Sequence, residues 1–138
     1  MDRQYLIRLP WPPKECAPNG QHGHWSKKSS AAKSYKEACA WECKAQYVQP
    51  VVTDAIVVEV TFNPPSNRKY DLDNALARCK QGLDAVAEAI GVDDANWREM
   101  RLVRGEKVHN GAVLVHVKKA DTYPLDGEIT DAWSGCGV

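Results

Sequence analysis

A stripe of apolar side chains between residues 74 and 91 constrains the fold more than any other feature of this sequence. Its members recur at intervals of three and four residues: Leu76, Cys79, Leu83, Val86, Ala87 and Ile90. This is the period of an α-helix with one face against a core. Gly91 follows the last member, and glycine is the residue favoured at the position just after a helix. We therefore expect one helix from Asn74 to about Gly91.

Carboxylates flank this predicted helix on both sides. Asp71 and Asp73 precede it, separated by one residue, and Asp93-Asp94 follow Gly91. In an extended segment Asp71 and Asp73 point to the same side, which places Asp73 to cap the helix. We expect Asp71, Asp73 and Asp94 to meet at one end of this element.

Lys80 and Asp84 are expected on the same flank of the helix as Asp73. At 100° per residue, both lie within about 20° of Asp73, beside the apolar stripe. The side chain of a helical lysine leans toward the N-terminus, so the Lys80 ammonium can reach back toward the carboxylates. The pattern thus predicts one cation among several anions.

Such a carboxylate group favours a divalent ion. Two carboxylates ~4 Å apart repel each other by roughly 4 kcal/mol at an effective dielectric constant of about 20. A set of oxygen ligands without histidine suits Mg²⁺, whose chemistry in proteins is phosphoryl transfer or phosphodiester hydrolysis. Two alternatives stay open: Asp71 and Asp73 as ordinary helix-capping residues, and Lys80 with Asp84 as a surface ion pair.

These motifs resemble those of the RusA family of Holliday junction resolvases, the phage and prophage type of crossover junction endodeoxyribonuclease. The resemblance runs in order from about Tyr5 to Lys118. It rests on four segments of the sequence: Leu9-Pro10-Trp11-Pro12-Pro13, Asp71-Leu72-Asp73-Asn74, Lys80 to Leu83-Asp84-Ala85, and Gly91-Val92-Asp93-Asp94.

The resemblance implies a structure-selective endonuclease that resolves four-way DNA junctions in recombination and repair. Asp71, Asp73 and Asp94 would hold Mg²⁺, with Mn²⁺ as a substitute ion, and Lys80 would stabilise charge on the phosphate. Asp84 would support Lys80. Because a four-way junction has two-fold symmetry, the resemblance also implies a homodimer. The alternatives are a non-catalytic protein that binds branched DNA and, less well matched because no glycine-rich phosphate loop is evident, a small-molecule phosphotransferase or phosphatase.

The charge distribution is compatible with a nucleic-acid partner although the whole chain has a formal net charge of zero. Residues 120–138 contain four acidic residues and no lysine or arginine, which leaves 18 basic against 14 acidic residues in 1–119. We therefore expect an endonuclease domain over residues 1–119 and an acidic tail over 120–138. The five cysteines lack paired spacing and are expected to be reduced thiols in a cytoplasmic protein. The sequence contains no run that reaches the length of a membrane span.

Basic residues outside the aspartate motif are candidate DNA contacts. Lys27, Lys28 and Lys33 lie on one predicted helix, where a solvated face is the alternative, and Arg68 and Lys69 precede the motif. His24 lies in a loop that can contact phosphate or sugar. A zinc site formed by His22, His24 and Cys16 is disfavoured because it lacks a fourth ligand at suitable spacing.

The remaining elements complete an α+β fold. We expect the order β-α-β-α-β-β, with two helices packed in one layer on a small mixed sheet. A hairpin is expected around Asn110-Gly111. The other predicted elements are a strand over Gln4 to Leu9, a helix from Ser26 or Ser29 to about Tyr47, a strand over Asp54 to Asn63, a short helix over Ala95 to Met100, and strands over Arg101 to Val108 and Ala112 to Lys118. In the first of these helices the three- and four-residue spacing places Ala32, Tyr35, Cys39 and Cys43 on the inward face. In the strand over Asp54 to Asn63, alternation places Ile56, Val58, Val60 and Phe62 on one face.

Overall fold

The computed structural model describes residues 5–17, 25–51 and 55–120, with the backbone alone for 25–28. Its elements are β1 (Tyr5–Leu9), η1 (Lys14–Cys16), α1 (Trp25–Ala45), β2 (Ile56–Asn63), α2 (Leu72–Arg78), α3 (Lys80–Ile90), η2 (Asp94–Asn96), β3 (Glu99–Arg104) and β4 (Ala112–Lys119), where η marks a 3₁₀ helix. The predicted acidic tail lies outside the described residues, apart from Ala120. In the described part of the chain, no helix is long and apolar enough to cross a membrane.

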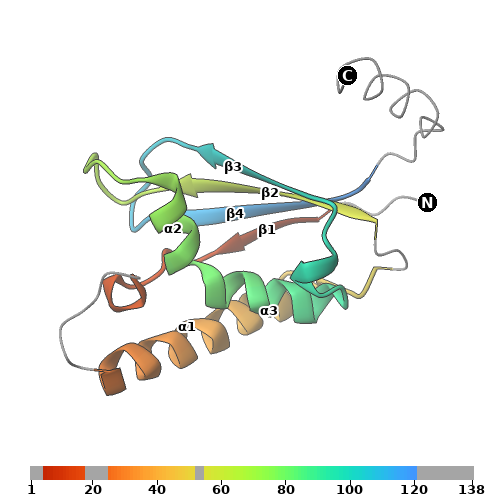
Figure 1. Cartoon of the computed structure of the whole chain (residues 1–138), viewed down its shortest axis with the longest axis horizontal. Helices are drawn as coiled ribbons and strands as arrows, with labels where there is room; N and C mark the ends of the chain where they lie inside the picture. Colours follow the sequence, from red (N-terminus) through yellow and green to blue (C-terminus); the bar gives the residue numbers. More distant parts are fainter. Residues whose placement is uncertain (1–4, 18–24, 52–54, 121–138) are drawn as a thin grey trace, which may run out of the picture.

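The strands form one mixed sheet in the order β1-β4-β2-β3, which confirms the α+β class. β4 is antiparallel to both β1 and β2, whereas β3 is parallel to β2. In Figure 1 the sheet forms one layer, and α1 and α3 form a second layer along one of its faces.

The predicted hairpin between the last two strands is wrong, because β2 lies between β3 and β4. Asn110 and Gly111 do form a turn with positive φ angles of 64° and 72°. That turn reverses the chain, but the connection crosses the end of β2, so that β4 pairs with the far side of β2 and not with β3. Turn residues specify a reversal, whereas strand pairing depends on which backbone groups become buried together.

The predicted helix over residues 74–91 is two helices, α2 and α3, joined at Cys79. The Cys79 backbone has φ −90° and ψ 2°, and its N–H is 3.1 Å from both the Ala75 and Leu76 carbonyl oxygens. Cys79 is fully buried, so the apolar stripe continues across the bend. α3 ends at Gly91, whose φ of 75° is left-handed, as predicted. In the described part of the chain, α2 and α3 therefore replace the single helix expected here.

The described core lies between the sheet and the pair α1 and α3. Ile56, Val58, Val60 and Phe62 from β2 are buried, as the alternation of that strand predicts. Tyr35, Cys39 and Cys43 of α1 face them from the helical layer, which confirms the inward face predicted for that helix.

The prediction of a short helix over Ala95 to Met100 is wrong. Only the 3₁₀ helix η2 forms there, and β3 begins at Glu99 because this segment pairs with β2.

Candidate functional site

Lys80 connects two of the carboxylates singled out in the sequence. Its ammonium nitrogen lies 3.2 Å from Asp84 Oδ1 and 3.2 Å from Asp94 Oδ2. The hydrogen bonds to Asp94 and then Asp84 raise the pKa of Lys80 above its ordinary value. Lys80 therefore lies beside acidic side chains, as predicted, but its partners are Asp84 and Asp94 and not the Asp71 and Asp73 carboxylates that precede the helix. We call Lys80, Asp84 and Asp94 the carboxylate–lysine cluster.

Asp94 is positioned by the short 3₁₀ helix that follows α3. The Asp93 carboxylate accepts a hydrogen bond from the Ala95 N–H at 3.0 Å and so caps η2. That bond lowers the pKa of Asp93. The local turn thus directs Asp94 back along α3 toward Lys80.

Asp71 and Asp73 lie at the start of α2. Within the described residues, their hydrogen bonds are to Asn74 and not to a member of the carboxylate–lysine cluster. Asp71 occupies the capping position that was predicted for Asp73, and Asp73 lies in the first turn. Asp71 Oδ2 accepts from the Asn74 side-chain amide at 3.3 Å, and Asp73 Oδ1 accepts from the Asn74 backbone N–H at 3.0 Å. Both carboxylates are exposed to solvent.

The candidate ligands Asp71 and Asp94 line different clefts. Asp71 borders a cleft of about 620 Å³, which we call the arginine–aromatic cleft; it is lined by Ala17, Lys69, Tyr70, Asp71, Asn74, Arg78 and Arg104. Asp94 borders a cleft of about 400 Å³ beside α3, together with Lys36, Asp84, Ala87, Glu88, Gly91 and Asp93.

The described residues of one chain do not gather Asp71, Asp73 and Asp94 into one group, and their role in holding Mg²⁺ stays a prediction. Among them, no three His, Cys, Asp or Glu side chains are grouped so that they could hold a metal ion. The physical reason lies in the arrangement of the helices. α2 intervenes between Asp71 and the start of α3, and the charge of Asp94 is compensated by Lys80.

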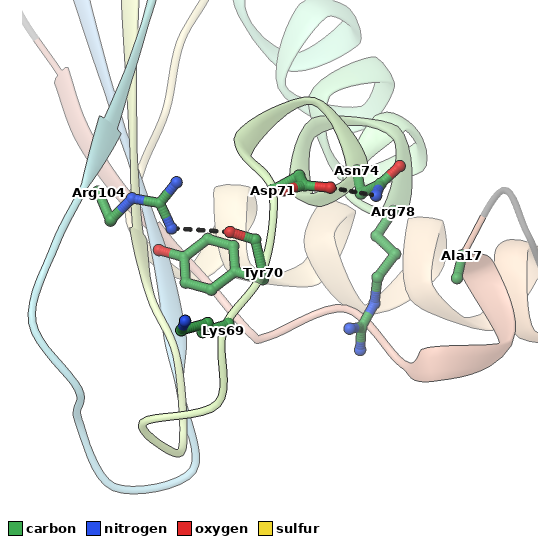
Figure 2. A pocket seen from close by; sticks show the side chains of 7 residues that line it. All are labelled: Ala17, Lys69, Tyr70, Asp71, Asn74, Arg78 and Arg104. Carbon is green, nitrogen blue, oxygen red and sulfur yellow. Dashed lines mark hydrogen bonds between the residues drawn. The ribbon is translucent and has the colours of Figure 1, made fainter.

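Two arginines are held in fixed positions in the arginine–aromatic cleft (Figure 2). Arg104 Nη1 donates to the Tyr70 carbonyl oxygen at 2.8 Å, and its guanidinium lies 4.5 Å from the centre of the Tyr70 ring. Arg78 Nη2 donates to the Pro12 carbonyl oxygen at 2.6 Å, and Nε donates to the Pro13 carbonyl oxygen at 3.3 Å. Both guanidinium groups are therefore oriented before any ligand arrives.

An aromatic pair lies between these arginines. The Arg78 guanidinium is 5.8 Å from the centre of the Trp11 ring, and the Trp11 and Tyr70 rings meet edge to face with centres 6.3 Å apart. Cation–π contacts of this kind orient a guanidinium without using its N–H donors. Partial burial lowers the pKa of Arg78, since desolvation disfavours its charged form.

A second cleft of about 540 Å³ adjoins the first and extends its basic surface. The two share Lys69, Tyr70 and Arg104. The second adds Arg68 and Lys107, with one carboxylate, Glu106, from the loops after β2 and β3. Together the clefts form one basic groove that borders Asp71.

The basic residues expected from the sequence fall into separate places. Arg68 and Lys69 line the groove, whereas Lys33 is exposed on α1. The side chains of Lys27 and Lys28, and all of His24, lie outside the described residues.

Sequence reasoning missed Arg78 and Arg104. A signal for Arg78 was present, because Asp71, Asn74 and Arg78 are spaced by three and four residues and so share one helix face. Arg104 offered no such signal. It reaches the cleft only because β3 ends beside Tyr70.

The fold and the groove define a small α+β protein with a basic, aromatic-lined surface beside a carboxylate. No protein-family model matches the chain. An uncharacterized protein of Xylella fastidiosa (strain Temecula1 / ATCC 700964) is 32% identical over 114 residues, which cover 80% of this chain and 74% of that relative. The chain belongs to the same family as that protein.

Proposed function

We propose that this protein is a structure-selective DNA endonuclease that resolves four-way junctions, similar to the RusA family, and acts as a homodimer in the cytoplasm. The observation that carries this proposal is the position of Asp71. Its carboxylate borders a cleft that also contains Lys69, Arg78 and Arg104. A carboxylate surrounded by cations suits a phosphodiester backbone brought close to an acidic group that takes part in hydrolysis.

The electrostatics of the groove support a nucleic-acid ligand. Lys or Arg contacts to phosphate release condensed counterions, and this term supplies most non-specific affinity for DNA. The groove presents Arg68, Lys69, Arg78, Arg104 and Lys107 on one continuous surface. An anionic strand lying there would pass next to Asp71.

The proposal includes dependence on Mg²⁺, or on Mn²⁺ as a substitute, because the aspartate motif resembles that of the RusA family. The described carboxylates of one chain form no three-ligand group. Lys69, Arg78 and Arg104 attract and position phosphate, and Lys80 holds Asp84 and Asp94 in place.

The proposal is tested by incubating pure protein with a synthetic four-way junction in Mg²⁺, in Mn²⁺ and in EDTA. We expect paired nicks at the junction with either ion, none in EDTA, and little cutting of a linear duplex of the same sequence. Junction binding is measured separately in EDTA by fluorescence anisotropy. Cutting of linear and branched DNA at the same rate would exclude structure selectivity.

Substitution of the motif aspartates tests the assignment of the site. We expect Asp71→Asn and Asp73→Asn each to abolish nicking while junction binding is kept, because both remove a carboxylate and reduce negative charge near phosphate. Asp93→Asn is the matched control, since it removes the same charge from an exposed aspartate while asparagine can still accept the Ala95 N–H bond that caps η2. Undiminished nicking by Asp71→Asn and Asp73→Asn would reject the assignment.

Lys80→Ala tests the contribution of the carboxylate–lysine cluster. We expect turnover of the junction to fall more than affinity for it, because Lys80 organises Asp84 and Asp94. A loss of affinity with unchanged turnover would mean that Lys80 only contacts the DNA phosphate backbone.

A second candidate function is binding of branched DNA without cleavage. The basic lining of the two clefts favours it, because such a lining attracts phosphate without any catalytic group. Tight, structure-selective binding with no nicking in Mg²⁺ or Mn²⁺ would establish this second function.

A further inference from the structure

We propose that Arg78 and Arg104 form a preorganised phosphate clamp, in which each guanidinium holds a phosphate group on its own side of Asp71. Figure 2 shows the two side chains well apart in the cleft, with Tyr70 and Asp71 between them. The inference deepens the proposed function and rests on it for the identity of the ligand as DNA. The binding of phosphate itself can be tested without that function.

The first argument is geometric preorganisation. Arg78 is held by the Pro12 and Pro13 carbonyl oxygens, and Arg104 by the Tyr70 carbonyl oxygen. A ring lies beside each guanidinium, Trp11 for Arg78 and Tyr70 for Arg104. A flexible arginine loses side-chain entropy when it binds an anion, whereas these two have already lost much of it on folding.

The second argument is the supply of unused donors. A guanidinium carries N–H groups on three nitrogens in a planar fork that matches phosphate oxygens. The hydrogen bonds found for Arg104 within the described residues use Nη1 alone, and those for Arg78 use Nε and Nη2. Each side chain keeps N–H donors for a ligand while remaining attached to the protein.

The third argument is the lack of a carboxylate partner. Within the described residues, neither Arg78 nor Arg104 forms an ion pair, whereas Lys36 pairs with Glu88 at 2.6 Å and Lys80 with Asp84 at 3.2 Å. Arg78 is also half-buried, and Glu15 interacts with it electrostatically without forming an ion pair among the described contacts, so its partly desolvated charge is incompletely compensated. A phosphate bound in the cleft would supply the missing negative charge.

A purely structural role is the competing explanation. Arg78 could serve only to attach the Pro12–Pro13 segment to α2, and Arg104 only to hold Tyr70 in place. Such roles predict a loss of stability on substitution, but no response of the wild-type guanidinium groups to added phosphate. The two explanations therefore differ in a property of the unmodified protein.

The first measurement uses the whole wild-type chain labelled with ¹⁵N, and follows the arginine Nε–Hε signals by NMR. Inorganic pyrophosphate is titrated first, followed in a separate sample by a short oligothymidylate. We expect saturable shifts of the Arg78 and Arg104 signals with both probes, and no comparable shift of Arg101. Arg101 is the internal reference because it lies on β3 with Arg104 but faces Glu59, at 3.8 Å.

The second measurement compares Arg78→Gln, Arg104→Gln and the matched control Arg101→Gln, which all remove the same charge. For oligothymidylate binding followed by anisotropy, we expect each clamp variant to lose roughly tenfold in affinity, as for a charge-assisted hydrogen bond. The slope of log affinity against log salt should fall by about 0.7 for each lost contact to a single strand. Arg101→Gln should stay within about twofold of the wild-type affinity.

The outcomes separate this inference from the proposed function. Equal losses in all three variants, or wild-type Arg78 and Arg104 signals that do not respond to either probe, would overturn the clamp. Intact clamp behaviour in a protein that does not cut junctions would reject the nuclease and keep the clamp. If Arg78→Gln fails to fold, Arg104→Gln and the wild-type titration still decide the question.

Discussion

At the residue scale, two buried tyrosine hydroxyl groups differ in their hydrogen bonding. Tyr35 Oη donates to the Pro10 carbonyl oxygen at 2.6 Å, and burial raises the pKa of Tyr35 far above its ordinary value. Tyr70 Oη is buried without a hydrogen-bond partner among the described residues, although its ring contacts Arg104 and Trp11. An unpartnered buried hydroxyl costs stability, whereas a paired one contributes to it.

The Tyr→Phe substitutions should therefore differ. We expect Tyr35→Phe to lower the free energy of unfolding by about 1–2 kcal/mol, because the Pro10 carbonyl loses its donor. Tyr70→Phe should change it by less than about 0.5 kcal/mol, or raise it slightly, since no described bond is lost. Urea unfolding of the two variants measures both values. A larger loss for Tyr70→Phe than for Tyr35→Phe would show that the Tyr70 hydroxyl has a partner in solution.

At the element scale, the close approach of α1 and α3 depends on Gly82. A Cβ atom built at Gly82 would lie 3.0 Å from Tyr35 Cε2, 3.1 Å from Cys39 Sγ and 3.2 Å from Leu9 Cδ1. All three contacts belong to the buried core. The glycine therefore lets α3 rest against α1 and the end of β1, which also fixes the start of α3 and the Lys80 side chain it carries.

Gly82→Ala sets helix propensity against packing. Alanine stabilises a helix interior by about 1 kcal/mol relative to glycine, whereas overpacking of a core costs about 1–3 kcal/mol. Because three buried neighbours would have to move, we expect a net loss of about 1 kcal/mol in thermal or urea unfolding. The neighbouring Gln81→Ala, on a half-exposed position, should stay within about 0.5 kcal/mol of the wild type. A stabilised Gly82→Ala would mean that α3 can move away from α1 at little cost.

At the scale of the whole molecule, the four cysteines in the described part of the chain report on the integrity of the core. Cys16, Cys39, Cys43 and Cys79 are all buried. Burial raises the pKa of Cys39 and Cys79 to about 12 and that of Cys43 to about 11. A raised thiol pKa means that almost no thiolate, the reactive form, exists near neutral pH.

We expect these four thiols to react with a disulfide reagent at pH 8 only when the fold opens. The measurement uses a Cys136→Ser background, so that the thiol outside the described residues does not contribute. Native labelling should be at least ~100-fold slower than labelling in urea, because reaction requires both exposure and ionisation. Rapid labelling of two or more thiols in the native protein would contradict the packing of α1 against α3.

The alternating residues Ile56, Val58, Val60 and Phe62 and the stripe from Leu76 to Ile90 were sufficient to predict β2, the inner face of the helical layer and the α+β class. The left-handed end of α3 at Gly91 and the position of Lys80 next to Asp84 also follow from local spacing. Periodicity indicates which side of an element is buried, because the buried side is determined by the spacing of apolar residues within that one element.

Only the tertiary structure decided what those sides are buried against. It placed β3 beside β2, bent the helix at Cys79, separated Asp71 from Asp94 and brought Arg104 to the cleft of Arg78. Each of these depends on contacts between segments far apart in the chain, where the deciding quantity is the total burial and pairing of backbone groups. Local spacing carries no information about that sum.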